Sequence, residues 1–369
     1  MSLLPTDDEV MLADAARGFL DAAAPIGHLR GLRDSGTTHD PALWTEICTM
    51  GWAGVLVPEA QGGSDMGHAA AGVLAREMGK TLVSSPFLST AVIAATALRK
   101  VADYRAQEAL GRIARGEVTY AIAVDEGPKH APEATELHAK PDGNGFHLTG
   151  TKRFVVDAGF ADRALVLART SAGMTLFDVP LDRDGMTLAS KSMIDARDAG
   201  DLYLDGVVAT GDDILGQVDD GMTVLTPALQ AGQAALAAEM IGLAAGAFAK
   251  TVGYLQDRKQ FGVPIGAFQS LQHRAAHLWT ETEITLSAIL NAGRILDNGE
   301  DATLAVSLAK ARASKTAELA VQEGVQMYGG IGMTDAHDIG FFMKRARVAA
   351  EWLGDYSYHA EIVARLRGF

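Results

Sequence analysis

The pattern of apolar and polar positions divides the chain into three stretches of different texture. Residues 1–117 repeat apolar positions at helical spacing. From Val118 to near Asp213, short apolar or alternating runs such as TYAIAV, RALVLART and GMTLFDV are separated by turn residues, which is typical of antiparallel strands. From about Gly221 the spacing is helical again. We therefore expect an N-terminal helical domain at 1–117, a middle β domain at 118–215 and a C-terminal helical domain at 216–369.

Helix ends are marked by capping residues. Thr6 and Glu9 have the spacing of a capping box in front of an apolar-periodic segment. Asp301 is suited to the N-cap of a helix that runs to about Tyr328, and Gly329 is suited to its C-terminal stop. These signals predict where the first helix and one of the long C-terminal helices begin or end.

Composition narrows the class of protein. The chain has 369 residues, of which 48% are hydrophobic and 21% charged, which is ordinary for a globular chain of two or three domains. Its formal charge of −14 argues against nucleic acid as a partner and gives no support for binding to anionic membranes. Cys48 is the single cysteine, so an intrachain disulfide is excluded.

The sequence lacks the signals of a secreted, membrane-spanning or metal-binding protein. The N-terminus MSLLPTDDEV lacks the features of a signal peptide. The longest mostly apolar run, 234–249, contains Glu239 and is shorter than the roughly 18 residues that a membrane span needs. We expect a cytoplasmic protein without a membrane segment. His273 and His277 have the spacing of helical metal ligands, but no third ligand is evident nearby, so we expect no metal.

Two clusters suggest a large cofactor. The run 258–272, RKQFGVPIGAFQSLQ, and the later QMYGGIGMT each follow a segment that we expect to be helical. Arg258 offers a planar cation that suits a phosphate, Phe261 an aromatic surface and Gly262 a close backbone approach. Each cluster alone could be a helix end with a turn. Together they indicate a phosphate-bearing, partly aromatic cofactor.

The order of the three stretches and their motifs resembles the acyl-CoA dehydrogenase family over essentially the whole chain. The resemblance implies that family's fold: an N-terminal helical domain, a middle antiparallel β-barrel or sandwich and a C-terminal four-helix bundle. It also implies FAD, an acyl-CoA substrate, a tetramer built as a dimer of dimers, and an electron-transfer flavoprotein or similar acceptor. The implied FAD contacts are Arg258, Phe261, Ile265, Phe268 and Gln269 from R-x-x-F-G, Gln326, Gly329 and Gly330 from QMYGGIG, and Phe154 and Val156 from GTKRFVVDAGFAD.

The resemblance also implies a mechanism. A carboxylate removes the α-proton of the thioester, flavin accepts the β-hydride, and hydrogen bonds to the thioester carbonyl stabilise the developing enolate. In the family, the RKQFG-type and GGIG-type segments reach into the flavin site of a neighbouring subunit. Oligomerisation is therefore expected to be part of the site.

The chain departs from the family pattern where the base is expected. The usual base position, shortly after MKRARVAAEW, is Leu353, and the alternative position on the helix before R-x-x-F-G is Gly232. Neither residue can abstract a proton. Three carboxylates remain as candidates. Asp355 is a weak candidate for the base, Glu351 suits a surface carboxylate and Glu239 suits an interhelical ion pair.

Other departures fall in the β domain and after the GGIG turn. The segment 125–135 replaces the family's Thr-Glu-Pro pattern, Phe154 replaces a tryptophan, and Val156 replaces a hydroxyl residue that bonds to the flavin, a loss of about one hydrogen bond. A basic group, Lys344, Arg345 and Arg347, suits either CoA phosphates or ion pairs on a helix face.

The expected activity is FAD-dependent α,β-dehydrogenation of an acyl-CoA thioester. The segments lent to a neighbour are intact while the chain's own site is depleted, as in the small, base-lacking subunits of heteromeric members such as pimeloyl-CoA dehydrogenase, which LGDYSYH and PIGAFQSLQHRAA also resemble. The partner would be a Glu-bearing paralogous subunit. Three alternatives stay open: a non-catalytic structural subunit that shares FAD, a flavin-dependent monooxygenase of the same fold, and a purely structural or CoA-binding protein.

Overall fold

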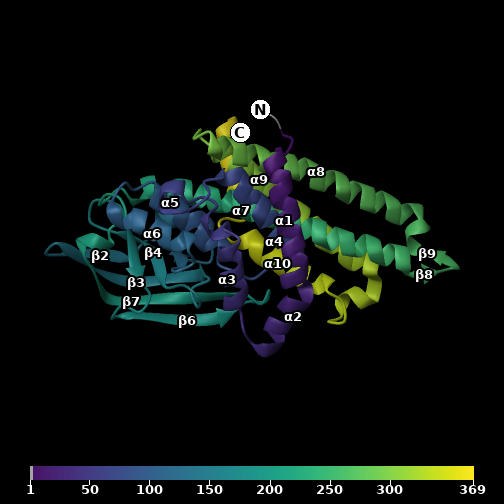
Figure 1. Ribbon diagram of the computed structural model, residues 1–369, viewed down its shortest axis with the longest axis horizontal. Coiled ribbons are helices and arrows are strands. Elements are labelled where there is room, and N and C mark those ends of the chain that lie inside the picture. Colours follow the sequence, from purple (N-terminus) through teal and green to yellow (C-terminus); the bar gives the residue numbers. More distant parts are fainter. Residues whose placement is uncertain (1–2) are drawn as a thin grey trace. The chain divides into compact units, whose positions relative to one another are not determined.

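The computed structural model of the protein describes residues 3–369 and is mainly helical with one larger β-sheet (Figure 1). Within the described residues the chain forms two compact units. The first contains the described residues up to Gly31, His68–Val83 and Gln233–Phe369, and the second contains Leu32–Gly67 and Ser84–Gly232. The division into three consecutive domains stays a prediction, because the N-terminal helices contribute to both units.

The first unit is helical. A small two-stranded hairpin joins α7 to α8 at one end of both helices (Figure 1). The elements are α1 (Asp7–Ala23), α2 (Ile26–Ser35, which continues into the second unit), α4 (Gly67–Thr81), most of α7 (Gly221–Asp257), β8 (Lys259–Gln260), β9 (Val263–Pro264), α8 (Gln269–Asp297), α9 (Thr303–Tyr328), α10 (Ile339–Glu351) and α11 (Tyr356–Arg367).

The second unit combines helices with a seven-stranded sheet of order β1-β4-β2-β3-β7-β6, to which β5 adds beside β4. Its helices are α3 (Pro41–Thr49), the π-helical segment Phe87–Ala94 that continues as α5 (Ala95–Arg99), and α6 (Tyr104–Ala114). Its strands are β1 (Tyr120–Ala123), β2 (His138–Asp142), β3 (Gly145–Val156), β4 (Arg163–Arg169), β5 (Met174–Pro180), β6 (Met186–Ser192) and β7 (Asp198–Ala209). Fully buried Leu148, Val166, Phe177 and Leu202 form part of its core.

The predicted fold class is confirmed, with one correction to the sheet. Strands begin at Tyr120 and the long helix begins at Gly221, close to the expected changes in texture. The sheet is not antiparallel throughout, because β1 pairs with β4 in parallel. Two strands separate β1 from β4 along the chain, and local alternation carries no information about such a long-range pairing.

The predicted helix caps largely hold. Thr6 and Glu9 form both hydrogen bonds of the capping box. The long C-terminal helix ends at Tyr328 with Gly329 as its cap, as expected. Its start differs by one residue, because the N-cap is Ala302 and not Asp301. The helix begins at Thr303, whose backbone N–H donates to the Oδ1 atom of Asp301 at 3.0 Å, so Asp301 supports the first turn from outside the cap position.

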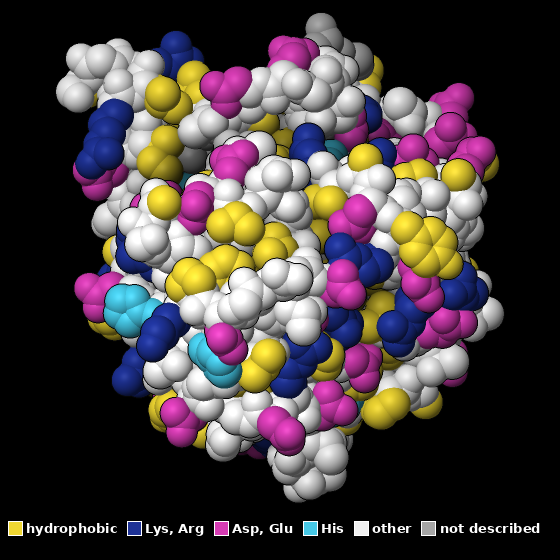
Figure 2. Space-filling model, turned by 90° about the vertical axis from the view of Figure 1, so that its left-hand side faces the viewer, with side chains coloured by type: hydrophobic (Ala, Val, Ile, Leu, Met, Phe, Trp, Pro, Cys, Tyr) yellow, Lys and Arg dark blue, Asp and Glu magenta, His cyan; other side chains and the backbone are white. Residues whose placement is uncertain are grey.

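Within the described residues, α7 is the one helix whose length and composition would also allow a membrane crossing. Two thirds of the window concerned (67%) are buried inside the protein, as in the core helix of a globular fold. On the face shown in Figure 2, acidic and basic side chains are interspersed and no large patch of one sign is visible. The negative net charge is therefore not gathered into one patch on this face.

Candidate functional site

The first predicted cofactor segment forms an exposed arm, residues 258–269, between α7 and α8. Arg258 is exposed, and its side chain makes no hydrogen bond or ion pair with any of the residues 3–369 that the structure describes. Phe261 has a positive φ of 54° and is 92% exposed. Its ring meets that of Phe268 edge-on at 6.1 Å. Ile265 is partly buried and Gln269 is exposed. The arm thus presents two cations, Arg258 and Lys259, and two aromatic rings to its surroundings.

An aromatic cluster brings the arm and the second predicted segment together. Tyr254, one turn before Arg258, stacks on Tyr328 with ring centroids 4.4 Å apart. His337 packs against both tyrosines, at 5.9 and 5.0 Å. The Tyr328 hydroxyl donates to the carbonyl oxygen of Lys250 at 3.0 Å. The end of α7 and the end of α9 therefore lie side by side, and each leads directly into a predicted cofactor segment.

The GGIG turn after α9 keeps its backbone open. Gly329 has φ 68° and ψ −148°, a conformation that is essentially restricted to glycine. A Cβ atom at Gly329 or Gly330 would meet nothing within 4 Å, so the surface over both residues is free. Gln326 is exposed one turn earlier. Because neither glycine has a side chain, a ligand can approach the backbone here more closely than it could at any other residue type.

In the second unit, the segment 150–162 is bent around two residues with positive φ. Phe154 has φ 53° and is 42% exposed, and Asp157 has φ 63° and is buried. The pairing of β3 with β7 shifts register between Lys152 and Val155. Val156 is buried, as its apolar side chain requires. The bulge turns the Phe154 ring outward, where it could pack against a planar ligand.

The bulged segment also holds two buried charged groups that sequence reasoning did not single out. The Ser89 hydroxyl donates to the Oδ2 atom of Asp157 at 2.6 Å. Lys152 is completely buried and pairs with Glu126 at 2.6 Å, and burial lowers the pKa of Lys152 to about 8. Glu126 lies in the divergent segment 125–135, where it also accepts two backbone N–H groups. The divergent segment is therefore anchored by an ion pair.

Both positions where a base is expected are buried. Leu353 is 2% exposed, and its backbone is left-handed with φ 57°. Its carbonyl oxygen accepts hydrogen bonds from Gln233 Nε2 at 3.1 Å and from His359 Nε2 at 3.0 Å. Gly232 lies in a buried stretch of α7 and belongs to the second unit.

The three remaining carboxylates are engaged in structural contacts. Glu239 is buried and pairs with Arg345 at 3.1 Å, which confirms the interhelical ion pair expected for Glu239. Glu351 pairs with Arg347 at 3.2 Å on the face of α10. Asp355 is the N-cap of α11 and accepts the backbone N–H of Tyr358 at 2.9 Å.

The same contacts place the basic group that follows the GGIG turn. Arg347 makes the helix-face ion pair that was one of the two expectations. Lys344 lies over the Phe341 ring at 5.9 Å. Arg345 fits neither expectation: it is buried and joins two helices rather than lying on one helix face.

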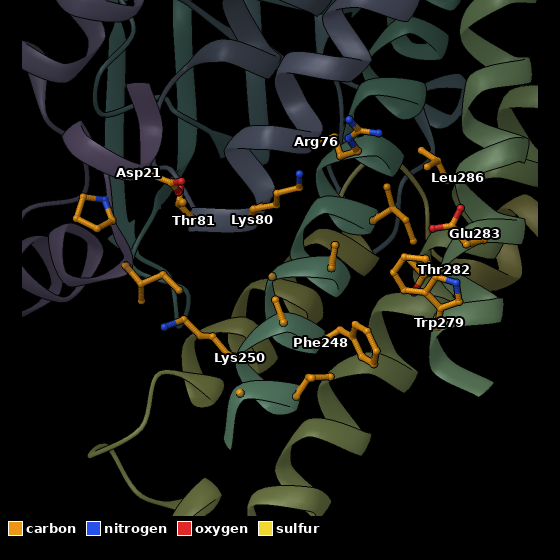
Figure 3. Close-up of a pocket in the computed structure, with 18 of the residues that line it drawn as sticks. Asp21, Arg76, Lys80, Thr81, Phe248, Lys250, Trp279, Thr282, Glu283 and Leu286 are labelled. Carbon is orange, nitrogen blue, oxygen red and sulfur yellow. The ribbon is translucent and has the colours of Figure 1, made fainter. Parts of the chain in front are cut away.

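A cavity of about 900 Å³ lies within the first unit, between α1, α4, α7 and α8. Figure 3 shows Phe248 and Trp279 on one side of it and Asp21, Lys80 and Thr81 on the other. The lining is mainly apolar. The three cations on its walls already have acidic partners: Arg76 and Lys80 pair with Glu77, and Lys250 pairs with Asp338. No predicted cofactor residue lines this cavity.

Family models match most of the chain. Residues 6–117 match the model described as the acyl-CoA dehydrogenase N-terminal domain, and residues 219–366 match the model of the C-terminal domain. The chain belongs to the acyl-CoA dehydrogenase family. Members of this family are flavoprotein oxidoreductases that bind FAD.

Individual proteins and solved structures resemble the chain over nearly its full length. The short/branched chain specific acyl-CoA dehydrogenase of Rattus norvegicus is 25% identical over 98% of this chain and 85% of the relative. The solved structure of a Tcur3481-Tcur3483 steroid ACAD variant is 30% identical, with a TM-score of 0.90 and 98% of both chains covered. The ChsE4-ChsE5 complex from Mycobacterium tuberculosis, at 23% identity, matches all of both chains with a TM-score of 0.92 and shares the fold.

The residues present fit the family's cofactor. Arg258 is exposed and without a side-chain partner among residues 3–369, which suits a diphosphate. The open surface over Gly330 suits close approach to the backbone, and Phe261 and Phe154 offer exposed rings. Within the described part of the chain, no three His, Cys, Asp or Glu side chains form a group that could hold a metal. Among the described residues, the structure offers FAD-type contacts and does not offer a metal centre.

Proposed function

We propose that this chain is the base-lacking, FAD-sharing subunit of a heteromeric acyl-CoA dehydrogenase. The proposal rests on one observation, the identity and burial of residue 353. A leucine stands at the base position with its side chain buried, and two side chains hold its carbonyl oxygen. The carboxylates that could replace the base are committed to Arg345, to Arg347 and to the cap of α11.

The proposed contribution of the chain is to hold FAD. Arg258 binds the diphosphate of the FAD that a neighbouring subunit carries, and Gly330 allows the backbone to approach the same cofactor. The Tyr254–Tyr328 stack supports this assignment, because it holds the ends of α7 and α9, which lead into the two segments, side by side. Phe154 lies against the flavin ring of the chain's own site.

When bound, FAD accepts the hydride from the β-carbon of the acyl group. The α-proton goes to a glutamate on a paralogous subunit. We further propose a dimer-of-dimers tetramer, an electron-transfer flavoprotein or similar acceptor, and a cytoplasmic location. These assignments rest on the family resemblance, on the exposed aromatic arm and on the composition of the chain.

The proposed substrate is an acyl-CoA thioester. The relatives bear names that indicate short or branched acyl chains in one case and steroids in the other. A panel of butyryl-CoA, a branched-chain acyl-CoA and a steroid-derived acyl-CoA separates these classes. The steroid class is supported by the relative with the higher identity, and preferential turnover of a small acyl-CoA would contradict it.

The test is to purify the chain alone and with a Glu-bearing paralogue, and to measure bound flavin and acyl-CoA-dependent reduction of an electron-acceptor dye. We expect turnover only when both subunits are present. Turnover by the chain alone would contradict the proposal. Activity that instead consumes oxygen and reduced flavin without a dye would support the monooxygenase alternative. Flavin binding without any stimulation of the partner would support a purely structural subunit.

A further inference from the structure

Lys310 is a completely buried cation in the first half of α9. Its Nζ atom donates hydrogen bonds to the carbonyl oxygens of Ala349 at 3.1 Å, Ala350 at 3.3 Å and Gly354 at 3.1 Å. Burying an ammonium group is unfavourable unless its protons are bonded, and here three protons meet three acceptors. Two acceptors lie at the end of α10 and the third lies within the turn to α11, so a single side chain bonds to carbonyl groups on either side of Leu353.

The turn that Lys310 spans has an unfavourable backbone. Leu353 and Gly354 both have positive φ, 57° and 100°. A left-handed conformation is unfavourable for a leucine and persists only where the surrounding structure holds it in place. Gln233 from α7 and His359 from α11 both donate to the Leu353 carbonyl oxygen. Side chains from three helices thus fix the four-residue turn.

We propose that Lys310 is a positioning residue that holds residue 353 in its left-handed conformation through the carbonyl groups on either side of it. Position 353 corresponds to the base position in the family, so the link to acyl-CoA rests on the proposed function. The positioning itself does not depend on that function, because it follows from the hydrogen bonds and the backbone angles. The backbone at position 353 is therefore held in a fixed conformation, and a leucine stands there in place of the carboxylate.

Hydrogen exchange of the purified assembly tests the positioning. Lys310→Met removes the donor, and Arg312→Met is the matched control, because Arg312 lies on the same helix and pairs with Glu281 on α8. We expect amides of 352–355 to exchange about tenfold faster in Lys310→Met, while β3 and β7 keep their protection and the control behaves like the wild type. Wild-type exchange of this turn in a folded Lys310→Met protein would overturn the proposal.

A second variant keeps the proposal testable if Lys310→Met does not fold. In a crystal structure of Leu353→Glu, which retains Lys310, we expect a positive φ at residue 353 and the same three hydrogen bonds from Lys310. A turn that relaxes to negative φ beside an unchanged Lys310 would overturn the proposal.

Acyl-CoA turnover by FAD-loaded Leu353→Glu separates the two proposals. We expect Leu353→Glu to gain turnover and Leu353→Glu/Lys310→Met to lose it again. An intact turn without turnover in Leu353→Glu supports the positioning and counts against the proposed function alone.

Discussion

Glu239 on α7 and Arg345 on α10 form a buried ion pair, with Arg345 Nη1 3.1 Å from Glu239 Oε1. Arg345 also donates to the carbonyl oxygens of Val83 at 3.0 Å and Leu82 at 3.3 Å, just beyond α4. One guanidinium therefore joins three segments of the first unit. This relationship explains why Glu239, although it is a mid-helix carboxylate in an apolar stretch, is committed to the fold.

Breaking this pair is expected to destabilise the protein. Glu239→Gln leaves Arg345 buried without its counter-charge, which should lower the free energy of unfolding by about 3 kcal/mol. The matched control is Glu351→Gln, which breaks the more exposed pair with Arg347 and should cost less than about 1 kcal/mol. Urea unfolding of both variants measures the difference. Equal losses of unfolding free energy in the two variants would show that the buried pair stabilises the protein no more than the exposed pair does.

Arg258 is expected to control flavin binding. Replacing Arg258 with alanine removes a charge-assisted contact to the diphosphate, so FAD affinity should fall about 10- to 100-fold. Lys259→Ala, at the adjacent exposed cation, should leave the affinity nearly unchanged. Titration of the co-purified assembly with FAD, followed by flavin fluorescence, measures both. A loss that is equal in the two variants would mean that only the general charge of the arm matters.

Stability should depend on pH through Lys310. Burial lowers the pKa of Lys310 from 10.5 to about 7, and the charges of Asp355 and Glu351 oppose this only in part. Between these two values the unfolded chain binds a proton that the folded chain has released, so the free energy of unfolding rises with pH. Below about pH 7 both states are protonated and the full cost of the buried charge remains.

Comparison with Lys310→Met isolates this effect. Lys152, whose pKa is also lowered by burial, contributes with the same sign, but it is present in both proteins and cancels in the difference. Unfolding free energies of the wild type should therefore rise relative to those of Lys310→Met as the pH increases above about 7. Parallel pH curves for the two proteins would contradict the prediction.

The aromatic arm is expected to act in assembly rather than in folding. Phe261 is 92% exposed, so Phe261→Ser should leave the melting temperature of the subunit nearly unchanged while weakening association. Tyr104→Ser is the matched control, because Tyr104 on α6 is also an aromatic side chain and is 80% exposed. Sedimentation velocity measures the oligomer distribution. Unchanged association of Phe261→Ser would contradict a role for the arm in the interface.

Local patterns in the sequence predicted the elements, their approximate limits and the fold class. The capping box at Thr6 and the stop at Gly329 depend on neighbours within four residues, so the sequence shows them directly. The parallel pairing of β1 with β4 and the burial of Arg345 depend on contacts between distant segments. Such contacts leave little trace in a single sequence.

The sequence contained a weak signal for the burial of Lys310. It falls on the buried stripe of α9 that Val306, Ala313, Ala317 and Ala320 form at spacings of three and four residues. A lysine within such a stripe indicates a buried cation that needs acceptors. The sequence could not indicate that these acceptors are carbonyl groups at the end of α10, because that depends on how α9 packs against α10 and α11.

The most direct test of the account is anaerobic addition of acyl-CoA to the isolated chain after incubation with FAD, followed through the visible absorbance of oxidised flavin. Leu353 cannot take the α-proton, so we predict no bleaching by the isolated chain and rapid bleaching once a Glu-bearing paralogue is added. Bleaching of the flavin by acyl-CoA in the isolated chain would show that this chain has a base of its own and would contradict the account.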